Sequence, residues 1–197
     1  MARGKTCLRK KFVVEKIFMK YAAQRRKSLS LTAFTLILLA TVAVAQDSYS
    51  DSKSIKADLV SFNQVPSVLA GSHGKFTAEI NDDGALTYSL SYSNMTSPVV
   101  QAHIHFGDSR TNGGVMVFLC GGAKPACPAS GTITGTLTAA DVSVLPVTNG
   151  DSVIPQGIQP GNFQGMVKAI ETGHSYVNVH TANFPSGEIR GQVKMDE

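Results

Sequence analysis

The chain has 197 residues, 43% of them hydrophobic, which suits one domain of ordinary size and excludes wholesale disorder. Basic side chains are concentrated at its start: residues 1–45 hold ten lysines and arginines and one acid, whereas residues 46–197 hold eight basic and thirteen acidic side chains. The net charge of +4 therefore comes from the leader, and the acidic remainder argues against nucleic-acid binding.

Residues 24–45 have the layout of a secretory signal peptide. A basic cluster at 25–27 precedes an apolar run at 29–42, and the small residues of an A-x-A cleavage site end at Ala45. The alternative is a membrane anchor, but this run is short and interrupted by threonine, and a spanning helix needs ~20 apolar residues. We expect cleavage before Gln46, a secreted or periplasmic protein, and no membrane attachment after cleavage.

The segment before this signal is longer than an ordinary basic n-region. A start at Met19 would give a signal peptide of 27 residues, and the first 18 residues would then be a mis-assigned start. The alternative is that the long basic stretch is itself targeting sequence. The sequence is compatible with both interpretations.

The chain after the leader is interpreted as a single domain. Residues 46–57 begin with a polar stretch and are expected to form a flexible lead-in. The domain itself is placed at 58–193, and 194–197 are interpreted as a tail.

Short strands make up most of this domain. Apolar and polar residues alternate with a period of two at 76–80 and 86–92, and the Asp83-Gly84 pair between these runs suits a hairpin turn. Further strands are predicted at Val99–Phe106, Val115–Leu119, Gly131–Leu137, Ser175–Thr181 and Glu188–Val193.

Two helical segments interrupt the strands. Residues 138–141 have the pattern of a capping box and begin a short turn of helix. Residues 162–172 place apolar side chains at i, i+3, i+4 and i+7, with Asn162 as the N-cap. Together these elements predict an all-β fold, an antiparallel Greek-key-like sandwich or barrel with one or two short helices.

Cys120 and Cys127 are the two cysteines of the chain after the leader, and they bracket the Gly/Pro-rich loop CGGAKPAC. An oxidising compartment would join them. The alternatives are two buried thiols or half of a metal site, for which the sequence after residue 45 has no further cysteine. We predict a Cys120–Cys127 disulfide.

The candidate functional residues are three histidines on two predicted strands. His103 and His105 lie two apart and therefore point to one face of their strand. His180 lies at the end of a second strand, on the face that it shares with Asn178. If the two strands are neighbours, three neutral imidazoles converge. Three nitrogen ligands without a thiolate suit Cu(II) or Zn(II), with an open position for water.

Asp108, Asn178 and Glu188 are the candidates for orienting the ring nitrogens that face away from the ion. The alternative is that the histidines are structural, because histidines on strands often hydrogen-bond to backbone or a carboxylate and bind no ion. Glu188 and Arg190 share a strand face and are interpreted as a solvated surface pair.

No catalytic residue is predicted. The serines have no G-x-S-x-G context, and no Gly-rich loop fits a P-loop or a dinucleotide fingerprint. We therefore favour binding over catalysis.

Five segments, taken together and in order, are similar to one known family. They are FTAEINDDGALTYSLSY at 76–92, AHIHFG at 102–107, GTITGTLTAADV at 131–142, YVNVHT at 176–181 and GEIRGQV at 187–193. They resemble the CHRD domain, a module first described in chordin and common in secreted bacterial proteins. The disulfide loop and the segment 143–161 look like additions to the shorter family core.

The resemblance implies a secreted, β-sandwich-like module without established enzyme activity. Chordin sequesters growth factors, and for this chain the resemblance leaves the partner as an unknown protein or glycan. The three histidines fall in the family's own motifs, which is compatible with a copper or zinc site and equally with a hydrogen-bonded cluster. A looser likeness to copper–zinc superoxide dismutases makes redox activity the least favoured variant, because the chain lacks a histidine-rich zinc loop.

Overall fold

The computed structural model describes residues 52–143 and 151–196. These described residues belong to one compact unit. The signal peptide predicted at 24–45 lies outside the described residues. No helix within the described ranges is long and apolar enough to cross a membrane.

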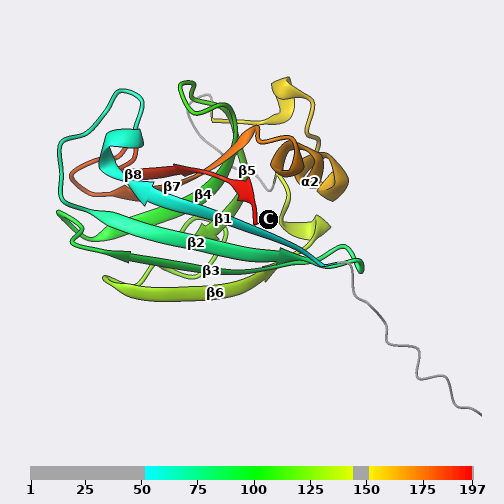
Figure 1. Cartoon of the computed structure of the whole chain (residues 1–197), viewed down its shortest axis with the longest axis horizontal. Coiled ribbons are helices and arrows are strands. Elements are labelled where there is room, and N and C mark those ends of the chain that lie inside the picture. Colours follow the sequence, from blue (N-terminus) through cyan, green and yellow to red (C-terminus); the bar gives the residue numbers. More distant parts are fainter. Residues whose placement is uncertain (1–51, 144–150, 197) are drawn as a thin grey trace, which may run out of the picture. The chain divides into compact units, whose positions relative to one another are not determined.

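One antiparallel sheet curls into a nearly closed barrel (Figure 1). Its strands follow the order β5-β4-β7-β8-β1-β2-β3-β6, and β9 pairs with β1. The predicted all-β class is confirmed, with the barrel as the form found. The strands are β1 (Lys53–Val60), β2 (His73–Ile80), β3 (Leu86–Ser93), β4 (Val99–Phe106), β5 (Val115–Cys120), β6 (Gly131–Leu137), β7 (Ser175–Thr181), β8 (Ile189–Gln192) and β9 (Lys194–Met195).

β1 is the strand that the sequence analysis missed. It includes residues 53–57, which were interpreted as part of a flexible lead-in, and it pairs with β2 along its whole length. Its buried positions Ile55, Ala57 and Leu59 alternate with exposed ones, as in any half-buried strand. The polar residues before Ile55 concealed this pattern. The expected tail likewise joins the sheet, as β9.

The hairpin of β2 and β3 confirms the clearest strand prediction. Their register runs from His73 opposite Ser93 to Ile80 opposite Leu86. Gly84 in the connecting turn has a φ of 82°, in the left-handed region that a glycine reaches without strain.

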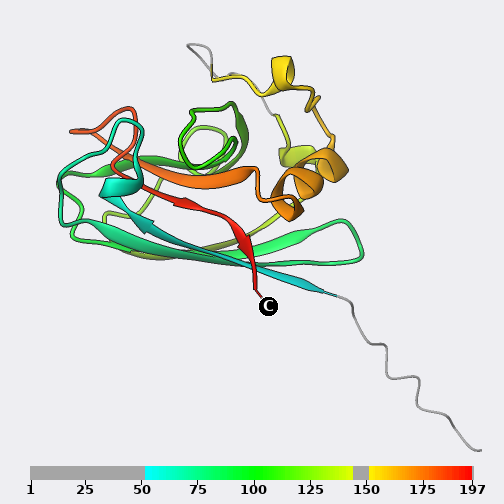
Figure 2. The ribbon, with the colours of Figure 1, turned by 45° about the horizontal axis from the view of Figure 1, so that its top comes forward.

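The inward side chains of the sheet form the hydrophobic core, which includes the fully buried Phe76, Leu90 and Ile104. The helix α2 (Phe163–Glu171) turns its buried face toward this core, and the Asn162 side chain caps it by accepting a hydrogen bond from Gly165 N at 2.9 Å. In both views the segment 151–171 lies at one end of the sheet (Figure 1, Figure 2). Three short 3-10 helices complete the elements of the described ranges: η1 (Ser61–Asn63), η2 (Ala139–Asp141) and η3 (Ile154–Gln156).

The predicted disulfide is confirmed. Cys120, the last residue of β5, is bonded to Cys127, with the two Cα atoms 5.0 Å apart. Both thiols are therefore used, which excludes their part in a metal site.

Candidate metal centre

The three histidines lie on adjacent strands, which was the condition for them to meet. β4 and β7 are antiparallel neighbours, and directly paired residues point to the same face of a sheet. That face is opposite to the one that carries Ala102 and Ile104 into the core. Three cross-strand pairs hold the histidines: His103–Asn178, His105–Tyr176 and His180–Gln101.

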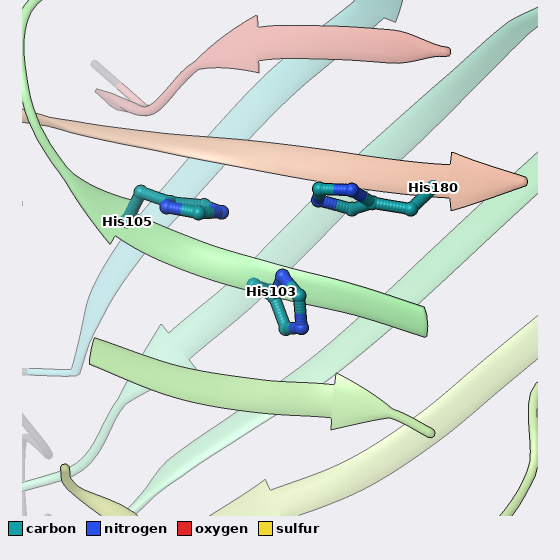
Figure 3. A group of neighbouring side chains, drawn as sticks. All are labelled: His103, His105 and His180. Carbon is teal, nitrogen blue, oxygen red and sulfur yellow. The ribbon is translucent and has the colours of Figure 1, made fainter. Parts of the chain in front are cut away.

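The imidazoles converge in a buried position. His103, His105 and His180 are 3%, 5% and 7% exposed, and one ring nitrogen from each lies within 4.8 Å of the others. Atoms so arranged all lie within about 2.8 Å of a common point, against 2.0–2.1 Å for a Zn–N bond, so the rings would draw in slightly around an ion. The rings of His105 and His180 are directed toward one another, with the ring of His103 beside the gap between them (Figure 3).

Backbone carbonyls fix the tautomer of two of these rings. His105 Nδ1 lies 2.9 Å from the carbonyl oxygen of Gly113, and His180 Nδ1 lies 2.8 Å from that of Pro185. A carbonyl oxygen only accepts, so each Nδ1 carries the proton and each neutral ring keeps a lone pair on Nε2. Both Nε2 atoms are buried and have no hydrogen-bond partner among the described residues. Metal-binding histidines are held in this manner.

His103 is held by packing alone. Its ring meets Phe118 edge to face at 4.4 Å between centroids and lies 4.9 Å from the ring of His180. Neither of its nitrogens has a partner within the described part of the chain. A buried polar atom left unpaired costs about 1–3 kcal/mol, so an unpaired imidazole here calls for an explanation, which a bound ion or water supplies.

The surroundings keep the rings neutral. Burial, together with the neighbouring His180 and His105, lowers the pKa of His103 to about 2. Burial likewise lowers the pKa of His105 to about 3, against the opposing effect of the Gly113 carbonyl. The pKa of His180 is also lowered by burial. At neutral pH no proton competes with a metal ion for these lone pairs.

Two of the residues predicted to orient the rings lie elsewhere. The Asp108 carboxylate is 2.5 Å from Nδ1 of His174, an exposed side chain. Glu188 accepts hydrogen bonds from Thr96 and Thr181. The carbonyls of Gly113 and Pro185 take the role that these carboxylates were expected to play.

The third, Asn178, lies beside the histidines. It is paired with His103 across the sheet, and its Oδ1 accepts a hydrogen bond from Gln64 Nε2 at 2.6 Å. This bond attaches the segment after η1 to the histidine face of the sheet. Asn178 makes no hydrogen bond to an imidazole among the described contacts.

The expected surface pair of Glu188 and Arg190 is wrong, because both side chains are fully buried. Loops cover this face of the sheet, and strand alternation does not distinguish a covered face from a solvated one. Glu188 holds the loop that follows β7: Thr181 donates its hydroxyl to the Glu188 carboxylate at 2.6 Å and accepts from Phe184 N at 3.2 Å. The same loop carries Pro185, whose carbonyl orients His180.

Arg190 holds the loop after β4 in the same way. Its guanidinium donates to the carbonyls of Asp108 at 2.6 Å and Thr111 at 2.8 Å and to Asn112 Oδ1 at 3.0 Å. This loop carries Gly113, whose carbonyl orients His105. Glu188 and Arg190 therefore affect the histidines indirectly, because they hold the loops whose backbone carbonyls orient the imidazole rings.

Tyr176 is a further contact that the sequence analysis did not assign. Its ring stacks on His105, with centroids 4.7 Å apart and planes 3° from parallel. The Arg190 guanidinium lies 3.4 Å from the centroid of the same ring. Since β7 lies between β4 and β8, the Tyr176 ring separates His105 from the charge of Arg190.

A cavity of about 400 Å³ lies beside the three imidazoles. Its other walls are mostly polar. They include Gln101, Asn112, Asp151, Asn178 and Ser186. An ion bound to the histidines would therefore face a polar space large enough for water.

The family follows from a comparison with family models. The model described as the CHRD domain matches residues 55–193. The chain belongs to the CHRD domain family. The match begins within β1 and takes in all three histidines. Neither the curated proteins nor the solved structures gave a match to this CHRD domain.

Proposed function

We propose that this CHRD domain binds one copper or zinc ion through Nε2 of His105, Nε2 of His180 and a ring nitrogen of His103. The observation that carries the proposal is the pair of buried, unpartnered Nε2 atoms, each on a ring whose proton is held on Nδ1 by a carbonyl. Three nitrogen donors without a thiolate match the preferences of Cu(II) and Zn(II).

A histidine cluster with a purely structural role explains fewer of these observations than a metal site does. Structural histidines in a buried site satisfy their nitrogens, whereas four of the six ring nitrogens here have no partner among the described residues. The depressed pKa values also exclude charged imidazoles at neutral pH as donors to one another. An ion shared by the three rings satisfies one lone pair on each.

The protein would bind this ion outside the cytoplasm. The disulfide supports export, because such bonds persist in oxidising compartments, and the predicted signal peptide agrees with it. We propose a secreted or periplasmic metal-binding module, with binding rather than catalysis as its activity.

Calorimetric titration of residues 46–197 with Zn(II) and Cu(II) at neutral pH tests this proposal. We expect one ion per chain in the wild type and loss of binding in a folded His103→Ala, His105→Ala, His180→Ala variant. The matched control is a His73→Ala, His174→Ala variant, which removes two exposed histidines and should bind as the wild type does. Absence of binding in the wild type, or equal binding in the triple variant, would contradict the proposal.

A further inference from the structure

The three ligands of the proposed site offer a divalent ion no negative charge. Its three imidazoles are neutral, and the Arg190 guanidinium lies 3.4 Å from the centroid of the Tyr176 ring that stacks on His105. Neutral nitrogen ligands alone can hold zinc, but an anion in the same cavity would offset the charge of the ion and raise its affinity.

Asp151 is the single acidic side chain among the described residues that line this cavity. Its backbone is anchored: Val115 N donates to the Asp151 carbonyl at 2.7 Å, and Ser152 forms a bridge with Val115. Its side chain is exposed and makes no hydrogen bond within the described structure. The carboxylate is therefore held near the histidines by the backbone and remains available for a ligand.

The position of the Asp151 carboxylate relative to the three imidazoles indicates how it would act. Asp151 and His180 line the same cavity, so the carboxylate lies on the side of the ring that the cavity leaves open. It is not among the ligand atoms that lie within 4.8 Å of one another, which are the three histidine nitrogens alone. A water molecule would bridge the remaining distance.

We propose that Asp151 is the anionic partner of the bound ion, with its carboxylate accepting a hydrogen bond from a water that the ion holds on the cavity side. This inference rests on the proposed metal binding. It adds a fourth residue to the site and assigns the polar cavity to a metal-bound water. Residues that support a metal ligand in this way typically contribute 10–100-fold to metal affinity.

The test is titration of residues 46–197 with Zn(II) and with Co(II), whose visible spectrum reports the number of ligands. We expect Asp151→Asn to bind one ion with the wild-type Co(II) spectrum and about 10–100-fold lower affinity. Asp151→Glu should recover part of this loss. High salt should narrow the difference between wild type and Asp151→Asn, because it screens an exposed carboxylate.

Asp108→Asn is the matched control. It removes another exposed carboxylate, which pairs with His174, and should change the affinity less than twofold. Wild-type affinity in Asp151→Asn would overturn the inference and leave the proposed function intact. If the wild type bound no ion, both the inference and the proposed function would fail.

Discussion

Lowering the pH from 7 to 5 is expected to destabilise the metal-free protein through His103 and His105. Their folded pKa values, about 2 and about 3, lie far below the ordinary 6.5, so only the unfolded chain takes up protons in this range. Stability is therefore full above pH 6.5 and falls as the pH drops below it. By pH 5 each histidine costs about 2 kcal/mol, or about 4 kcal/mol for the two.

This loss is large against the 5–15 kcal/mol that is typical of a domain. Urea unfolding at pH 7 and pH 5, followed by circular dichroism without metal, measures it directly. Glu188 does not complicate this comparison. Its pKa is also lowered, but its contribution to the free energy of unfolding is lost only as the pH falls below the ordinary carboxyl pKa. A His103→Gln, His105→Gln variant should lose about 4 kcal/mol less than the wild type between the two pH values, and the lowered pKa of His180 accounts for the pH dependence that remains. Equal pH dependence in variant and wild type would refute the burial argument.

Three further predictions follow from other contacts. Arg190→Lys replaces the two terminal guanidinium nitrogens that reach three acceptors on the loop after β4 with a single ammonium nitrogen, so its free energy of unfolding should fall by about 1.5–3 kcal/mol in urea unfolding. An unchanged value would contradict the role given to the guanidinium. A Cys120→Ser, Cys127→Ser variant should lose about 2 kcal/mol, and a reducing agent should weaken the wild type but not the variant. Zn(II) at 100 times its Kd should stabilise the wild type by about 2.7 kcal/mol, measured by calorimetric melting. An equal gain in the His103→Ala, His105→Ala, His180→Ala variant would contradict this.

The sequence predicted the strands because side-chain alternation is a local property. This alternation predicted the paired strands β2 and β3, the bounds of β4 and β7, and the strand face on which each histidine lies. β1 was not predicted, because its polar first residues obscured the alternation that starts at Ile55. Which strands are neighbours is set by long-range pairing, so the adjacency of β4 and β7 could only be stated as a condition.

The groups around the histidines were harder to predict for a different reason. The carbonyls of Gly113 and Pro185 belong to loops, and any residue type carries a carbonyl, so no side-chain pattern marks them. Carboxylates were the visible candidates, and Asp108 and Glu188 have other partners. The burial of Arg190 likewise depends on loops that cover an outer face of the sheet, and strand periodicity contains no information on them.

A zinc-soaked crystal, examined by anomalous scattering, tests the metal site most directly. The account predicts one peak among the three rings, about 2.0–2.1 Å from Nε2 of His105 and of His180, with the Nδ1 contacts to Gly113 and Pro185 retained. Peaks confined to exposed histidines such as His73 and His174, with the three buried rings free of metal, would contradict it.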